Sequence, residues 1–125
     1  MSGKHRVYLD EMRKRGEKVV PEDYLKGVLK AYGMPVPACR LCASADEAVA
    51  FAAEAGFPVV LKLASGKVLH KTELKGVRLG LENAEAVRSA FTEMDSGFKE
   101  AAIEGYLGIL VEHQAPAGTE LIVGL

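Results

Sequence analysis

The sequence lacks an excess of charge of either sign and a long apolar run. The net charge of its 125 residues is −1 at pH 7, with 26% charged residues, so it offers no basic field for nucleic acid and no acidic tail. No apolar run approaches the ~20 residues that cross a bilayer, and the charged N-terminus, MSGKHRVYLDEMRKRG, does not resemble a signal peptide. We therefore predict a one-domain, cytoplasmic protein that binds neither nucleic acid nor a membrane.

Side chains that bind metals are also scarce. Cys39 and Cys42 form a C-x-x-C pair, but zinc would need two more ligands, and the histidines are scattered at His5, His70 and His113. The pair lies in a segment that reads as extended, where residues three apart point to opposite faces, rather than at the start of a helix. We predict two ordinary half-buried thiols and no metal site in this chain.

A polar loop between two apolar runs is the most informative feature that the sequence does contain. The first run follows Pro58 and includes Lys62, and the second is Val77–Leu81; both have the length and boundaries of strands. An unpaired ammonium away from water is costly, so a lysine within a strand is predicted to have a function. The loop Ser65–Gly76 combines cationic side chains with glycines, which is typical of a lid over a phosphate group.

Helix and strand signals alternate along the rest of the chain. Helices are predicted at His5–Arg15, from Pro21 to Gly33, from a capping box at Ser44 to Gly56, and after Asn83 with the apolar stripe Ala84, Val87, Ala90, Phe91 and Met94. Further strands are predicted at Val36–Ala43, at Ile109–Val111 after a turn at Gly105–Gly108, and at Thr119–Val123. Two hairpin-like pairs exclude a simple series of βαβ units, so we predict an α+β fold with helices packed on a sheet of mixed direction.

The last predicted strand runs into Leu125 without a turn signal. A domain seldom stops in the middle of a sheet, because the edge strand then lacks its neighbour. We therefore expect either further sequence in the natural protein or pairing of this strand with a second copy.

Four segments occur in the same order as in a known family. They are the turn Tyr32–Pro37, the strand Pro58–Lys62, the loop His70–Thr72 with Gly76–Leu79 after it, and the hinge Leu110–Val111 with Pro116–Gly124 after it. This order resembles the N-terminal half of the ATP-grasp domain of ADP-forming acyl-CoA synthetases of the acetate–CoA ligase type. The resemblance begins near Gly16, so we expect residues 1–20 to form a helical lead-in and residues 21–125 to form the half-domain.

The resemblance implies a site for ATP or ADP. Lys62 would contact the phosphates, because a point charge on a rigid strand stabilises negative charge there. The loop residues that would cover the phosphates include Ser65, Gly66, Gly76 and Val77. The residues implied at the base and the ribose are Glu112, the backbone from His113 to Ala115, and Glu120. Solvated strand acids are the alternative interpretation of Glu112 and Glu120.

His70 is the residue to which the resemblance assigns chemistry. It would carry a phosphoryl group between a CoA-binding subunit and ADP, as a neutral imidazole is nucleophilic near pH 7. The sequence departs from the family at three points: Ser65–Lys67 stands where Ser-Pro-Asp is usual, Lys75 replaces a common glycine, and His113 stands where many members have Glu. The acids that hold Mg²⁺ in this fold lie in the second half of the domain, so its ligands are expected outside this chain.

The whole enzyme would convert a small carboxylic acid, CoA and ATP into acyl-CoA, ADP and phosphate, with a CoA-binding subunit or domain as partner. Two alternatives remain open at this point. The same half-domain occurs in protein acetyltransferases that carry an ATP-grasp module, and a short chain could dock to a CoA-binding partner without turnover.

Overall fold

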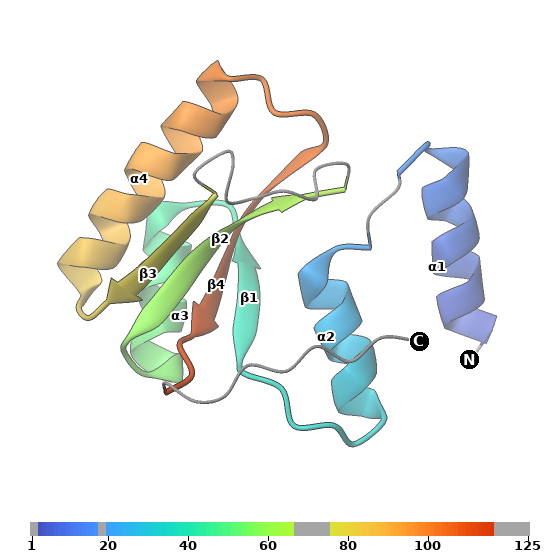
Figure 1. The fold of residues 1–125 in the computed structure, drawn as a ribbon, viewed down its shortest axis with the longest axis horizontal. Helices are drawn as coiled ribbons and strands as arrows, with labels where there is room; N and C mark the ends of the chain where they lie inside the picture. The colour runs from blue at the N-terminus through green and yellow to red at the C-terminus, as the bar shows by residue number, and fades with distance from the viewer. Residues whose placement is uncertain (1–2, 18–19, 67–75, 117–125) are drawn as a thin grey trace.

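The computed structural model describes residues 3–17, 20–66 and 76–116, and the structural statements below concern these residues. Four helices and four strands are present in this part of the chain (Figure 1). The helices are α1 (Gly3–Lys14), α2 (Glu22–Ala31), α3 (Ala45–Ala55) and α4 (Ala84–Glu100). The strands are β1 (Cys39–Cys42), β2 (Val59–Ser65), β3 (Val77–Leu81) and β4 (Tyr106–His113).

The strands form one sheet in the order β1-β4-β2-β3. The two inner strands are joined over their whole length, with Lys62 opposite Leu110 and Val60 opposite Glu112. The α+β class is confirmed. The described pairs β1–β4, β2–β3 and β2–β4 are all antiparallel, so the parallel component of the predicted mixed sheet is not seen among the described residues.

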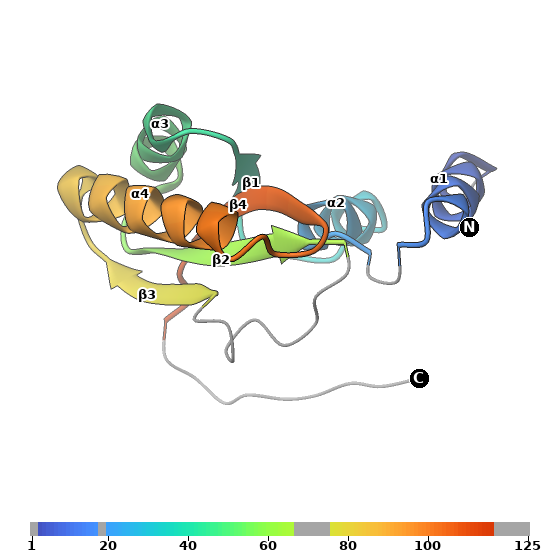
Figure 2. The ribbon, with the colours of Figure 1, turned by 90° about the horizontal axis from the view of Figure 1, so that it is seen from above.

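Helices α3 and α4 cover one face of the sheet (Figure 2). Alternate residues of the inner strands point to this face, and they pack with the apolar side of α4. The buried cluster includes Val59, Leu61 and Leu63 of β2, Ile109 and Val111 of β4, and Val87, Phe91, Met94 and Phe98 of α4. The opposite face therefore carries the other set of alternating residues, and that set includes Lys62 and Glu112.

Helix ends follow the sequence signals closely. The Ser44 hydroxyl accepts a hydrogen bond from the Glu47 amide at 3.2 Å, and the Glu47 carboxylate accepts one from the Ala43 amide at 3.1 Å. The Asn83 side chain caps α4 in the same way, by accepting from the Ala86 amide at 2.8 Å. The predicted stripe of α4 is correct except at Ala84, which is exposed, and it extends further to Phe98.

Strand boundaries follow the sequence less well. β1 is shorter than the predicted Val36–Ala43, whereas β4 begins at Tyr106 and takes in Gly108, which was predicted to lie in a turn. Ser65 was predicted to belong to the loop but is the last residue of β2. The predicted strand Thr119–Val123 lies outside the described residues.

The first two helices contact each other mainly through aromatic side chains. Tyr8 of α1 stacks on Tyr24 of α2 with ring centroids 3.8 Å apart, and His5 Nδ1 lies 2.7 Å from the Tyr24 hydroxyl. None of the described residues of α2 is buried, and Leu25 within it and Tyr32 at its C-cap are exposed. Apolar burial therefore does little to hold α2 against the sheet.

Candidate functional site

Lys62 stands in the middle of the inner strand β2, on the face opposite α3 and α4. Its side chain is 23% exposed, so its ammonium is partly withdrawn from water. The ammonium donates a hydrogen bond to Glu22 Oε1 at 3.0 Å and lies 3.6 Å from Glu112 Oε1. The ammonium thus lies beside two carboxylates in the folded chain, and one of them, that of Glu22, comes from outside the sheet.

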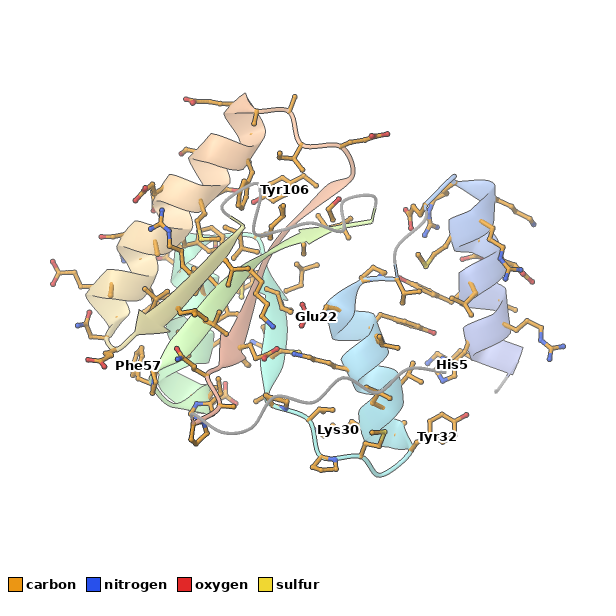
Figure 3. The ribbon with its side chains drawn as sticks, viewed as in Figure 1. His5, Glu22, Lys30, Tyr32, Phe57 and Tyr106 are labelled. Carbon is orange, nitrogen blue, oxygen red and sulfur yellow. The ribbon has the colours of Figure 1, made fainter. Side chains whose placement is uncertain are left out.

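Glu112 and the helix α2 complete a cluster of alternating charges. The Lys26 ammonium contacts Glu112 Oε2 and lies 3.2 Å from Glu22 Oε1. Each of the two lysines thus lies beside the same two carboxylates. Figure 3 shows Glu22 between the start of α2 and the sheet. We call Glu22, Lys26, Lys62 and Glu112 the charge cluster.

Sequence reasoning missed the two members of the charge cluster that α2 supplies. Neither Glu22 nor Lys26 was singled out as a site residue from the sequence. A signal did exist, because Glu22 and Lys26 stand four residues apart with the acid first, the favourable order for an ion pair on a helix. Their contact with the sheet is a tertiary feature that this spacing does not reveal.

The two ends of the predicted phosphate-covering loop are anchored to the sheet. Gly76 accepts a hydrogen bond from the Leu63 amide at 2.6 Å, and Gly66 donates one to the Gly105 carbonyl at 3.2 Å. Val77 lies directly across from Lys62 in the β2–β3 pair. Ser65 is buried, and its hydroxyl donates to the Glu104 carbonyl at 2.8 Å. That hydrogen bond gives the Ser65 hydroxyl a structural partner that the sequence did not predict.

Some of the hydrogen-bonding groups of the predicted hinge at the end of β4 already have partners within the chain. The His113 amide donates to the Ala38 carbonyl at 3.1 Å and the Gln114 amide to the Pro58 carbonyl at 2.9 Å. The His113 ring turns to α3, where Nδ1 donates to the Gly56 carbonyl at 2.8 Å. Ala115 follows these two residues and is exposed, so it is the hinge residue best placed for a ligand.

Two residues to which the resemblance assigns important roles, His70 and Glu120, lie outside the described residues. The loop residues 67–75 and the segment 117–125 around them are not described either. Their positions relative to the charge cluster stay predictions.

The two cysteines lie on opposite faces of β1, as predicted. Cys39 pairs with Glu112 on the face of the charge cluster, while Cys42 belongs to the buried core. Burial raises the pKa of both thiols, that of Cys42 to about 11, so neither favours the thiolate. Among the residues that the structure describes, no group of three His, Cys, Asp or Glu side chains could hold a metal ion.

A hollow of about 340 Å³ adjoins the charge cluster at the edge of the sheet. Lys26 and Lys30 line it from α2, and Cys39 and Phe51 line it from β1 and α3. Lys26 therefore stands between this hollow and Glu112.

No helix in the described part of the chain is both long and apolar enough to cross a bilayer.

The described part of the chain is an α+β domain in which Lys62 lies beside Glu112, two residues that the resemblance assigned to a nucleotide site. Comparison with known proteins agrees with this class. Residues 11–125 match the family of ATP-grasp domains, and the chain belongs to that family. The predicted family membership is thus confirmed.

Several relatives of this chain are ADP-forming ligases. The chain is 34% identical over 116 residues to the beta subunit of an ADP-forming acetate–CoA ligase I from Pyrococcus furiosus, covering 92% of this chain and 50% of that subunit. It thus spans about half the length of this relative. The ligase interpretation is supported by these matches, whereas the protein acetyltransferase alternative is not favoured.

Solved structures of an acetyl-coenzyme A synthetase from Ca. Korarchaeum cryptofilum have the same fold. One, in complex with coenzyme A and Ca-AMPCP, has a TM-score of 0.79 and 39% identity over 90% of this chain and 50% of the other. In a second structure of that protein, with Mg-AMPPCP, a phosphohistidine segment points towards the nucleotide-binding site; here the TM-score is 0.68 and the identity 36%, over 90% of this chain and 46% of the other.

Proposed function

We propose that this chain is the nucleotide-binding N-terminal half of an ADP-forming acyl-CoA synthetase, with residues 1–20 as a lead-in and residues 21–125 as the half-domain. The observation that carries the proposal is the pairing of Lys62 with Glu112 on the face of the sheet opposite α3 and α4, in a chain that belongs to the ATP-grasp family. The whole enzyme would make acyl-CoA, ADP and phosphate from a carboxylic acid, CoA and ATP.

Lys62 is the proposed contact for the phosphates of ATP or ADP. Its ammonium is fixed on a rigid inner strand, which suits a charge that must meet negative oxygens without reorganisation. The loop that would close over those phosphates begins at Gly66 and ends at Gly76 and Val77. Its two ends are fixed by backbone hydrogen bonds, from Gly66 to Gly105 and from Leu63 to Gly76. Ser65 would act at the start of this loop, through its backbone.

The base and ribose are assigned to residues at the end of β4 and beyond. Glu112 would face the base from the end of the strand, and Ala115 would offer backbone groups because the amides of His113 and Gln114 already have partners. Glu120 would accept hydrogen bonds from the ribose hydroxyls. Mg²⁺ would accompany the nucleotide, with protein ligands outside this chain.

His70 is the proposed phosphoryl carrier. One of its ring nitrogens would attack the phosphorus of an acyl phosphate formed at the CoA-binding subunit; the N–P bond forms as the acyl O–P bond breaks and the carboxylate leaves. A terminal oxygen of ADP would then attack the same phosphorus and release the neutral ring, giving ATP. In the ligase direction the same steps run backwards. The phosphohistidine segment of the Korarchaeum protein supports phosphoryl transfer through a histidine in this family.

A labelling experiment on the whole enzyme tests the carrier. With ATP labelled at its γ-phosphate, the nucleotide-binding part should acquire acid-labile label, and a His70→Asn variant should acquire none. Asn keeps a polar side chain of similar size but cannot form a phosphoramidate, so ATP binding should stay near that of the natural protein while ADP formation that depends on acid and CoA is lost.

His5→Asn is the matched control for this experiment. His5 lies on α1 against Tyr24, and its replacement should leave both labelling and turnover unchanged. Full turnover by His70→Asn would show that His70 is an ordinary loop residue and that the phosphoryl group follows another route.

A further inference from the structure

The charge cluster couples a helix to the proposed phosphate-binding lysine. Its two ammonium groups and two carboxylates alternate, and the distances from Glu22 Oε1 to Lys62 Nζ and Lys26 Nζ are 3.0 and 3.2 Å. The four charges sum to zero. Replacement of Lys26 by a neutral residue therefore leaves the charge cluster with a net charge of −1 beside Lys62.

Burial makes that balance matter. The Glu112 side chain is 10% exposed and that of Lys26 is 16% exposed, so water screens their interaction poorly. A carboxylate that is mostly withdrawn from water needs a counter-ion, and removal of one partner of such a pair is strongly unfavourable. Without Lys26, Lys62 would be the remaining ammonium of the charge cluster beside Glu112 and Glu22.

The position of α2 indicates that the contact serves the site rather than the core. This helix has no fully buried residue, and Leu25 and Tyr32 are exposed. Its side chains reach the sheet face at Lys62 and Glu112 through Glu22 and Lys26. Lys30, one turn further along α2, is exposed and lines the adjoining hollow.

We propose that Lys26 is a positioning residue of the nucleotide site, which neutralises Glu112 and shares Glu22 so that the charge of Lys62 remains available to nucleotide phosphates. This inference rests on the proposed nucleotide binding and adds a residue from α2 to it. Lys26 acts through Lys62 and Glu112, not by contact with the phosphates. Its effect is electrostatic, so a compensating change of charge on α2 should cancel its loss.

Calorimetric titration of this chain with ADP tests the proposal through four forms. Lys26→Gln leaves the cluster with a net charge of −1 and should bind ADP roughly tenfold more weakly, the scale expected for one poorly screened charge at this range. Lys26→Gln combined with Glu22→Gln returns the cluster to zero and should recover most of that loss. Lys30→Gln, the matched control on the same helix, should bind as the natural chain does.

The outcomes separate this inference from the proposed function. If the natural chain binds ADP and Lys26→Gln binds it as well as Lys30→Gln does, Lys26 has no part in the site, while the nucleotide proposal stands. If the double variant stays as weak as Lys26→Gln, charge balance is not the cause and the inference fails. If the natural chain itself does not bind ADP, the proposed function and this inference both fall.

A second variant covers the case in which Lys26→Gln does not fold, which circular dichroism would reveal. Glu22→Gln alone removes one negative charge beside Lys62 and leaves Lys26 in place on Glu112. It should bind ADP more tightly than the natural chain, and the gain should shrink as salt is added. Unchanged or weaker binding by Glu22→Gln would overturn the proposal.

Discussion

Among single residues, Lys62 illustrates how a charged side chain can occupy an inner strand. Its stem runs across the sheet face beside Val77, while its ammonium ends at two carboxylates. An amphipathic side chain of this kind buries its methylene groups and keeps its charge paired. The strand supplies rigidity and the acids supply the counter-charge, which together suit a fixed phosphate contact.

Tyr106 and Asp95 form a second polar contact, between β4 and α4. The Tyr106 hydroxyl donates to Asp95 Oδ1 at 2.7 Å, and the Tyr106 ring packs edge-on against Phe98. Burial acts to raise the pKa of Asp95, but the hydrogen bonds from Tyr106 and Lys99 outweigh it, so the pKa lies below its ordinary value of 3.8. Burial and the Asp95 carboxylate raise the pKa of Tyr106.

Tyr106→Phe should lower the free energy of unfolding by about 1 kcal/mol at neutral pH, because it removes this hydrogen bond and keeps the ring. The loss should depend on pH. A carboxyl whose folded-state pKa is depressed stabilises the fold above its unfolded-state pKa, and that contribution disappears as the pH falls through the folded-state value. The difference between the two proteins should therefore be constant above about pH 5 and shrink below the ordinary value of 3.8.

Urea denaturation at a series of pH values measures this difference. A gap between the two proteins that stays constant down to pH 2 would contradict the assigned role of Asp95. On the alkaline side, the raised pKa of Tyr106 predicts that its contribution is complete below 10.0, the ordinary value, and declines as the pH rises beyond it.

The candidate site could be predicted from sequence only where one residue carries the signal by itself. Lys62 stands out because a charge interrupts an apolar strand, whereas Glu112 was assigned only through the resemblance. Glu22 and Lys26 look like an ordinary surface pair, and only the folded chain brings them to the sheet. Ser65 was assigned to the phosphate-covering loop, and nothing in the neighbouring sequence reveals the Glu104 carbonyl that its hydroxyl meets.

At the scale of elements, helix boundaries were predicted better than strand boundaries. Caps such as Ser44 and Asn83 act within a few residues, so their signal is local and the structure confirms it. Strand length depends on the partner: β4 extends back to Tyr106 because β2 runs beside it as far as Ser65. Gly108 was predicted to lie in a turn, yet it lies inside β4.

Gly108 allows β4 to approach β1 closely. Its φ is +138°, and a Cβ there would lie 2.9 Å from the Cys42 carbonyl oxygen, a backbone atom that cannot move aside easily. A glycine inside a strand often marks such an approach. The same residue type therefore gives a turn signal in the sequence and serves a packing need in the fold.

Gly108→Ala should lower the free energy of unfolding by roughly 2 kcal/mol or more, from backbone strain and the contact with Cys42. Gly97→Ala is the control with the opposite sign. Gly97 lies within α4 with nothing inside 4 Å of its added Cβ, so alanine should stabilise the helix by about 1 kcal/mol. Thermal or urea unfolding measures the change in stability of each variant. Equal stability of Gly108→Ala and the natural chain would contradict the strand geometry.

At the scale of the whole molecule, one face of the sheet carries the structural core and the other carries the charges. Helices α3 and α4 cover the first, while α2 reaches the second through its ion pairs (Figures 1 and 3). The chain spans about half of the ligase subunit that it resembles. The proposed cleft would then be completed by the other half of the domain, so nucleotide binding by this half alone should be weak.

The central claim is that Lys62 marks a nucleotide site, and calorimetric titration of ADP into this chain and its Lys62→Met variant tests it most directly. Methionine keeps the length of the side chain and removes its charge, so the loss should appear in ground-state binding as well as in turnover. The account predicts weak binding by the natural chain, in the millimolar range, and at least roughly tenfold weaker binding by Lys62→Met. Equal affinity of the two folded proteins, or no heat from the natural chain at millimolar ADP, would contradict it.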